Sequence, residues 1–159
     1  MNDGYRSNLI KNIEENLNDF QSILSSLPDH NPNPENSRLK IREIIRTVTV
    51  VEEDILEMRL KKIIELENPY LPAIQVERLK EQAIQNQRSL EQLIEKFLYQ
   101  KKEIIRFLYN IPVFSWDRTG FHELEGHVTF EEFIRRMIRN DKQNISLLRE
   151  SLESDEGLN

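Results

Sequence analysis

The sequence predicts an all-α protein, a single four-helix-bundle domain over residues 1–152. Two observations carry this prediction. Hydrophobic residues recur at steps of three and four in four long segments, which is the period of a helix with one apolar face. Glycine is scarce, with only 4 Gly in 159 residues, and 38% of the residues are hydrophobic. Four helices with one apolar face each bury those faces most simply in a bundle, so we expect no sheet.

The first helix is expected over residues 4–27. Its apolar face would consist of Tyr5, Leu9, Ile13, Leu17, Phe20, Leu24 and Leu27. Pro28 should end this helix, because a proline cannot continue the hydrogen-bonding pattern. The following stretch, 28–36, is rich in proline and asparagine and predicts a loop.

The second helix is expected over residues 38–67, with Ser37 as its N-cap and Asn68-Pro69 after its end. Its apolar stripe would consist of Ile41, Ile44, Ile45, Val48, Val51, Ile55, Met58 and Ile63. The run 47–51 contains only threonine and valine, which favour strands. The helical period continues on both sides of it, and propensity is a weak guide, so we expect a helix there as well.

The third helical stretch is expected over residues 74–109, with a break near Gln87. The break is indicated by Ser89-Leu90-Glu91-Gln92, which matches a capping box and so marks a helix start. A long connection, 110–128, should follow. Thr129-Phe130-Glu131-Glu132 is a second capping box and opens the last helix, expected over 130–152. Residues 153–159 should form an acidic, frayed tail.

Composition excludes several classes of protein. There are no cysteines, which excludes disulfides, thiolate metal sites and a cysteine nucleophile and fits a cytoplasmic protein. The N-terminus has no basic and apolar signal segment, and no apolar run approaches the roughly 18 residues of a membrane span. The net charge is −6. The basic pairs lie among glutamates, so neither a membrane nor a nucleic acid is expected as a partner.

Polar residues on predicted apolar faces are the first candidates for a functional site. Asn140 and Asn144 lie four residues apart in the last helix, on the face that carries Phe133, Met137 and Leu148. A buried, unpaired amide costs roughly 1–3 kcal/mol, so the pair must either be satisfied within the structure or form the floor of a polar pocket. In the second helix, Thr47 lies on the apolar face; bonding back to a carbonyl one turn earlier is the common alternative to a pocket role.

The later part of the chain resembles the DinB-like superfamily, in particular the branch of YfiT-like metal-dependent hydrolases and bacillithiol transferases. Members of that branch run Arg-Thr-Gly, a histidine, a glycine and Val-Thr before the last helix. The matching residues here are Arg118-Thr119-Gly120, His122, Gly126 and Val128-Thr129. Segments 39–60 and 89–97 resemble the second and third helices of the family, so the resemblance covers about residues 38–150.

The resemblance implies a four-helix bundle that holds zinc or nickel through one histidine of the second helix and a His-x-x-x-His pair of the last. These positions correspond to Thr47, Asn140 and Asn144. All three are substituted. Neutral amide and hydroxyl oxygens are poor ligands for zinc, which prefers imidazole and thiolate. We therefore expect no bound metal at this site, with zinc or nickel as the alternative.

The chain has only three histidines that could rescue a metal site. His30 lies in the proline-rich loop, whereas His122 and His127 share the 110–128 connection and could meet at one ion if it folds back. Solvated or structurally bonded loop histidines are the common alternative. Glu52 and Asp141 could add carboxylates near the pocket, although solvated charge on a helix face is the simpler expectation for both.

Three further residues of the connection are expected to anchor it. Trp116 should pack over the end of the bundle, Arg118 should bond a carboxylate or a carbonyl, and Gly126 should adopt a left-handed turn conformation. All but Gly126 are also possible neighbours of the pocket.

Two functions follow from these observations. The first is a metal-free DinB-like pseudoenzyme that binds a small molecule or a partner helix. The second is an active metal-dependent thiol S-transferase or hydrolase with unusual ligands. A homodimer is expected, because Val50, Leu56 and Leu60 extend the apolar surface of the second helix beyond one stripe.

Overall fold

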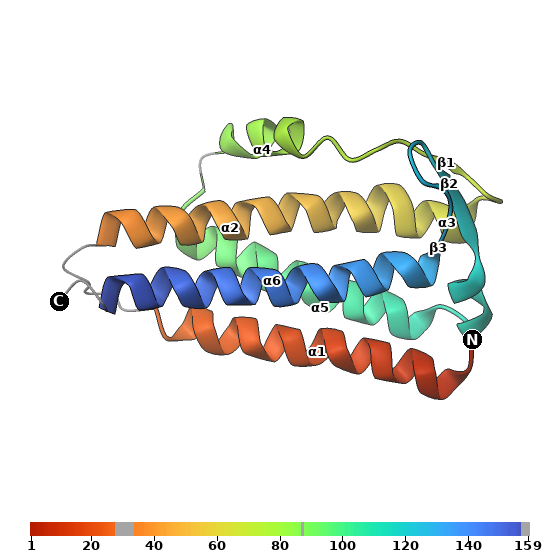
Figure 1. Cartoon of the computed structure of the whole chain (residues 1–159), viewed down its shortest axis with the longest axis horizontal. Helices are drawn as coiled ribbons and strands as arrows, with labels where there is room; N and C mark the ends of the chain where they lie inside the picture. The colour runs from red at the N-terminus through yellow and green to blue at the C-terminus, as the bar shows by residue number, and fades with distance from the viewer. Residues whose placement is uncertain (28–33, 87, 157–159) are drawn as a thin grey trace.

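The computed structural model describes residues 1–27, 34–86 and 88–156 and confirms the four long helices (Figure 1). They are α1 (Asp3–Ser25), α2 (Pro34–Ile55), α5 (Leu90–Asn110) and α6 (Phe130–Glu156). α1 and α2 each pack against both α5 and α6. The consecutive helices α1 and α2 are therefore diagonal to each other across the bundle. None of the described helices is long and apolar enough to cross a membrane.

The predicted helix starts are present. Ser89 Oγ accepts from the backbone N–H of Gln92 at 3.2 Å, and the Gln92 side chain accepts from the Ser89 N–H at 3.0 Å, which completes the capping box of α5. Thr129 Oγ1 accepts from the Glu132 N–H at 3.1 Å and opens α6. A short helix, α4 (Val76–Ile84), precedes α5 and packs on α2. The predicted break lies between α4 and α5, although Gln87 itself is outside the described residues.

Two predicted boundaries were wrong. α2 begins at Pro34, before the expected cap Ser37, because proline suits the first turn of a helix. α6 continues to Glu156, beyond the expected end of the last helix at residue 152. Residues 28–33, including His30, lie outside the described residues, so the predictions made for them stay predictions.

The second helix contains a π-helical turn, η1 (Leu56–Leu60), followed by α3 (Lys61–Glu65). The extra residue of a π turn shifts the faces of the helix. Leu56 and Leu60 are consequently buried in the core, whereas Met58 is 46% exposed. The prediction that Leu56 and Leu60 add apolar surface, and that Met58 faces the core, was therefore wrong. Only the half-buried Val50 remains of the surface on which the homodimer prediction rested.

The expectation of no sheet was also wrong. β1 (Tyr70–Leu71), β2 (Thr119–His122) and β3 (Gly126–Thr129) form a small three-stranded sheet in the order β1-β2-β3, at one end of the bundle (Figure 1). β1 is parallel to β2, and β2 is antiparallel to β3. A 3₁₀ helix, η2 (Val113–Asp117), leads from α5 into β2. Strands of two to four residues are too short to show alternation in the sequence.

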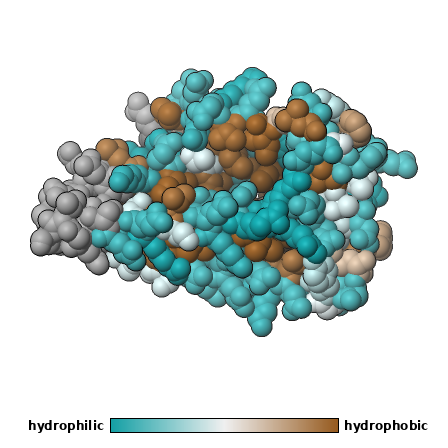
Figure 2. Space-filling view, viewed as in Figure 1, coloured by the Kyte–Doolittle hydropathy of each residue, from teal (hydrophilic) through white to brown (hydrophobic). Residues whose placement is uncertain are grey.

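The core of the bundle is divided along its length. One hydrophobic cluster lies at the end that carries the sheet and includes Ile13, Leu60, Ile104 and Ile134. A second lies toward the other end and includes Phe20, Ile45, Phe97 and Ile145. The helical positions between the two clusters hold buried polar residues. Figure 2 shows that the surface of the bundle, seen from the same side as in Figure 1, is mostly hydrophilic and is interrupted by hydrophobic patches.

Candidate functional site

The buried polar residues between the two clusters come from all four long helices. We call them the polar layer: Asn16 of α1, Thr49 and Glu52 of α2, Gln100 and Lys101 of α5, and Asp141 of α6. All six are at most 8% exposed. Each follows the local apolar spacing: Lys101 lies between Phe97 and Ile104, and Asp141 between Met137 and Ile145. Helix geometry therefore directs them inward.

Lys101 is the centre of the polar layer. Its ammonium donates to Glu52 Oε1 at 2.5 Å and also forms a short contact with Asp141 Oδ2. The ammonium lies 5.9 Å from the centre of the Phe20 ring. The side chains of Lys101 and Asp141 are fully buried, and that of Glu52 is 4% exposed. A charge is tolerated in such a place only when it is paired, so these three groups depend on one another.

The uncharged members of the polar layer bond to backbone carbonyls. Asn16 Nδ2 donates to Ile138 O at 3.3 Å, Gln100 Nε2 to Thr49 O at 2.9 Å, and Thr49 Oγ1 to Ile45 O at 2.6 Å. The carboxylates are less well satisfied. Glu52 Oε2 and Asp141 Oδ1 are buried and have no hydrogen-bond partner among the described residues.

The charges of the polar layer do not balance when every group is ionised. Two carboxylates and one ammonium leave one excess negative charge in a buried place. Burial raises the pKa of Glu52 well above its ordinary value, the Asp141 carboxylate raises it further, and Lys101 opposes the shift. Burial by itself lowers the pKa of Lys101, but the two carboxylates outweigh this and raise it, so its ammonium stays charged. The raised pKa of Glu52 acts against this excess charge, because its carboxyl takes up a proton more readily than an ordinary glutamate does.

Two adjoining hollows reach this layer from the surface along the seam between α2 and α5. The first, about 350 Å³, lies between α2, α4 and the start of α5, and includes Thr49 in its lining. The second, about 520 Å³, lies between α2, η1 and α5, and includes Gln100. Both are lined by Glu53, Glu57 and Lys96. We call the two together the seam groove.

The structure does not place the three predicted pocket residues on the buried face. Asn140 is exposed, and Thr47 and Asn144 are half-buried. The Thr47 hydroxyl lies 3.5 Å from the Glu43 side chain, whereas Thr49 makes the expected bond to a carbonyl one turn earlier. The inward face of α6 runs through Ile134, Asp141 and Ile145, so the placement of Asn140 on the apolar stripe was wrong.

The expectation of solvated charge at Glu52 and Asp141 was also wrong, because both belong to the polar layer. The family metal does not fit the residues found here. Thr47, Asn140 and Asn144 offer no imidazole, and the two carboxylates that do converge are already occupied by Lys101. Among the described residues, no three His, Asp or Glu side chains are grouped as metal ligands would be.

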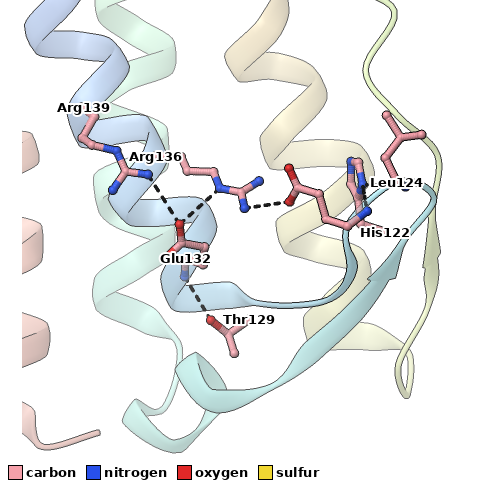
Figure 3. Close-up of polar contacts among 7 residues, drawn as sticks. His122, Leu124, Thr129, Glu132, Arg136 and Arg139 are labelled. Carbon is pink, nitrogen blue, oxygen red and sulfur yellow. Dashed lines mark hydrogen bonds and ion pairs between the residues drawn. The ribbon is translucent and has the colours of Figure 1, made fainter.

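The histidines of the connection do not meet at an ion. The register pairs Phe121 with His127 and His122 with Gly126, so His122 and His127 lie on opposite faces of the sheet. The His127 ring packs against Phe121 on the outer face, with centroids 5.3 Å apart. His122 is buried, and its Nδ1 accepts from the backbone N–H groups of Leu124 and Glu125 (Figure 3). Its role is to hold the β2–β3 turn.

The same turn is tied to α6 by ion pairs. Arg136 lies 2.7 Å from Glu125 and 3.3 Å from Glu132, and Arg139 also reaches Glu132 (Figure 3). The hydrogen bond from Arg136 lowers the pKa of Glu125. These side chains are part-exposed, so they position the hairpin without forming an enclosed site.

Trp116 and Arg118 anchor the connection as predicted. Trp116 is fully buried and meets the Phe130 ring edge-on at 5.3 Å. Arg118 donates from Nε to Ile63 O at 2.7 Å and from a terminal nitrogen to Leu66 O at 2.8 Å, so it caps the end of α3. Gly126 has a φ of 76°, the predicted left-handed conformation. These residues lie at the end of the bundle that carries the sheet, and the polar layer lies farther along the bundle, between the two hydrophobic clusters.

Comparison with known proteins identifies the fold. No family model and no curated protein sequence matches the chain. A solved structure does match, with a TM-score of 0.77 over 97% of this chain and 89% of the other, at 11% sequence identity. It is YfiT from Bacillus subtilis, described as a probable metal-dependent hydrolase with an unusual four-helix bundle topology. The two proteins share a fold, as the resemblance implied. At this level of sequence identity the match shows the fold alone and no shared activity.

Proposed function

We propose that this protein is a non-catalytic binding module on the fold that it shares with a probable metal-dependent hydrolase. One observation carries the proposal. Lys101 is fully buried at the centre of the bundle, and its ammonium lies between Glu52 of α2 and Asp141 of α6. A charged lysine held by two carboxylates is neither a free nucleophile nor a base, because its lone pair is protonated. The centre is then structural, and function lies at the surface.

The seam groove is the place where we propose that a small molecule binds. Its lining offers both signs of charge, because Arg46, Arg88 and Lys96 are basic and Glu53, Asp54 and Glu57 are acidic. Lys96 and Glu53 lie 3.5 Å apart across it. Such a lining suits a small polar molecule that carries both an acidic and a basic group, since each charge finds a partner.

The first hollow of the seam groove is covered by a weakly held helix, α4. No residue of α4 is buried, and its ion pair to α2, between Lys80 and Glu43, is long at 3.8 Å. A helix without buried side chains is stabilised little by packing, because stability comes mainly from the burial of an apolar face. We propose that α4 moves aside to admit the ligand and settles on it afterwards.

Metal analysis of the untagged protein separates this function from a metal-dependent S-transferase or hydrolase. For a binding module we expect zinc and nickel far below one per chain, with no loss of thermal stability after chelation. About one zinc or nickel per chain, lost together with a hydrolase or thiol-transferase activity on chelation, would replace the proposal with the enzyme.

Ligand binding is tested with a thermal-shift screen of small zwitterionic metabolites. A hit should be weakened by Lys96→Ala, which removes a cation from both hollows, and unchanged by Lys11→Ala, an exposed position on α1. Equal loss in both variants, or none in either, would place binding outside the seam groove.

A further inference from the structure

We propose that Glu52 and Asp141 form a divalent-cation site that Lys101 occupies with its own ammonium group, so that shortening this side chain opens the site to an ion such as Mn²⁺. The inference goes beyond the proposed function, because it concerns the polar layer whether or not the seam groove binds a ligand. It rests on three features of the layer.

The first feature is the geometry of the carboxylates. Glu52 belongs to α2 and Asp141 to α6, and oxygens from both contact the same nitrogen atom, Lys101 Nζ. Two acidic groups on separate helices that converge on one point are the arrangement that holds a cation. The bundle fixes this convergence, because α2 packs directly against α6.

The second feature is spare ligand capacity. One oxygen of each carboxylate, Glu52 Oε2 and Asp141 Oδ1, is buried without a hydrogen-bond partner among the described residues. An ammonium has three protons in tetrahedral directions and leaves these oxygens unused. A metal ion can take both oxygens of a carboxylate, so these orphaned atoms are available as ligands.

The third feature is charge. The two carboxylates carry two negative charges, and Lys101 supplies only one positive charge. A divalent ion in place of the ammonium would neutralise the layer in full.

The ligand chemistry selects the probe. Carboxylate oxygens suit hard ions such as Mg²⁺, Ca²⁺ and Mn²⁺, whereas zinc and nickel favour imidazole. Lys101→Ala removes the side chain beyond Cβ and leaves space for an ion with bound water between the carboxylates. Mn²⁺ is the useful probe, because its free form is measured directly by electron paramagnetic resonance.

The experiment compares four chains titrated with Mn²⁺: wild type, Lys101→Ala, Lys102→Ala and the double variant Lys101→Ala with Asp141→Asn. Lys102 is the exposed neighbour on the same helix and serves as the matched control. We expect one saturable Mn²⁺ site in Lys101→Ala alone. Its melting temperature should rise by roughly 5–10 °C at a Mn²⁺ concentration about a hundredfold above Kd.

For folded variants, either of two results would overturn the proposal. One is a folded Lys101→Ala protein, judged by circular dichroism, without a saturable site. The other is equal Mn²⁺ binding by the double variant, which would place the ion elsewhere. If Lys101→Ala does not fold without metal, Mn²⁺ should restore its helical signal. Lys101→Ser, whose hydroxyl can bond the carboxyls, repeats the test, and absence of rescue in both variants also refutes the site.

Discussion

Glu52 gives the stability of this protein a pH dependence of the opposite sign to that of an ordinary ion-paired carboxylate. The charged groups that face it are Lys101 from α5 and Asp141 from α6. The helix α1 adds only uncharged residues, Asn16 and Phe20, at the same height along the bundle. Because burial raises the pKa of Glu52 in the folded state, the folded protein binds a proton that the unfolded chain releases near pH 4.5. The stabilisation is therefore present below that pH and is lost as pH rises through the raised pKa.

We expect the free energy of unfolding of the wild type to fall between pH 5 and the raised pKa of Glu52. The fall should be about 1.4 kcal/mol for each pH unit in which the folded protein holds this proton and the unfolded chain does not. Urea denaturation at several pH values measures it. Glu52→Gln stays neutral and should flatten the curve, whereas Glu15→Gln, at an exposed position of α1, should leave it unchanged. A slope that persists in Glu52→Gln would mean that another group holds the proton.

The polar layer could not be predicted from residue type alone. Lys101-Lys102 is one of the basic pairs that lie among glutamates, and solvated charge is the simpler expectation for Glu52 and Asp141. The spacing of the apolar residues could have predicted the layer. A charged residue stands at an apolar position of the helical period in three places: Glu52 between Val48 and Ile55, Lys101 between Phe97 and Ile104, and Asp141 between Met137 and Ile145. Asn140 and Asp141 are adjacent in the chain and therefore point about 100° apart on the helix, and the packing of α6 against α1 and α2 decides which one turns inward.

Among the elements, the small sheet depends on a close approach at Gly120. A methyl group there would lie 2.4 Å from Leu71 Cδ1 and 3.3 Å from Ile63 Cγ1. Both neighbours are fully buried, so neither side chain has room to move. We expect Gly120→Ala to lower the free energy of unfolding by roughly 1–3 kcal/mol. Gly4→Ala, whose nearest contact would be 3.5 Å, is the control for urea denaturation, and equal midpoints would show that the sheet can yield.

Arg118 joins the same sheet to the end of α3. Its two donors reach the carbonyls of Ile63 and Leu66, which have no intrahelical partners at a helix end. Lysine keeps the charge but not the planar fork, so Arg118→Lys should cost about 1–2 kcal/mol. Faster hydrogen exchange limited to residues 61–71 and 118–129 is the expected signature. Unchanged exchange there would show that the cap is dispensable.

The long helices could be predicted because their stripes run for many turns and their caps use specific side chains. Ser89 and Thr129 marked the starts of α5 and α6, and the helical period correctly outweighed the strand preference of residues 47–51. The π turn could not be predicted, because one added residue changes the facing of Leu56, Met58 and Leu60 without any breaker in the sequence. The sheet could not be predicted either, because its strands are stabilised by pairing between segments that are distant in the chain.

For the whole molecule, the homodimer remains a prediction, but we now expect its interface at a different surface. Leu56 and Leu60 are buried, but the end that carries the sheet exposes Tyr70, Phe121 and Leu124, at 58%, 42% and 77%. Tyr70 and Phe121 are paired across the strands. We still expect a homodimer, now through this end, because exposed apolar surface favours association. Light scattering over a range of concentrations measures the mass. A monomer throughout, or a dimer unaffected by Phe121→Ser, would contradict this placement.

The diagonal placement of α1 and α2 has a consequence for how the chain is made. Each of these helices finds its packing partners in α5 and α6, which are synthesised later. The half of the chain that leaves the ribosome first therefore holds two amphipathic helices without a core to share. Folding during synthesis must wait for α5, and the polar layer cannot close until Asp141 has emerged. By the same logic, two separately expressed fragments cut between α4 and α5 would each be unstructured alone and would fold only on meeting.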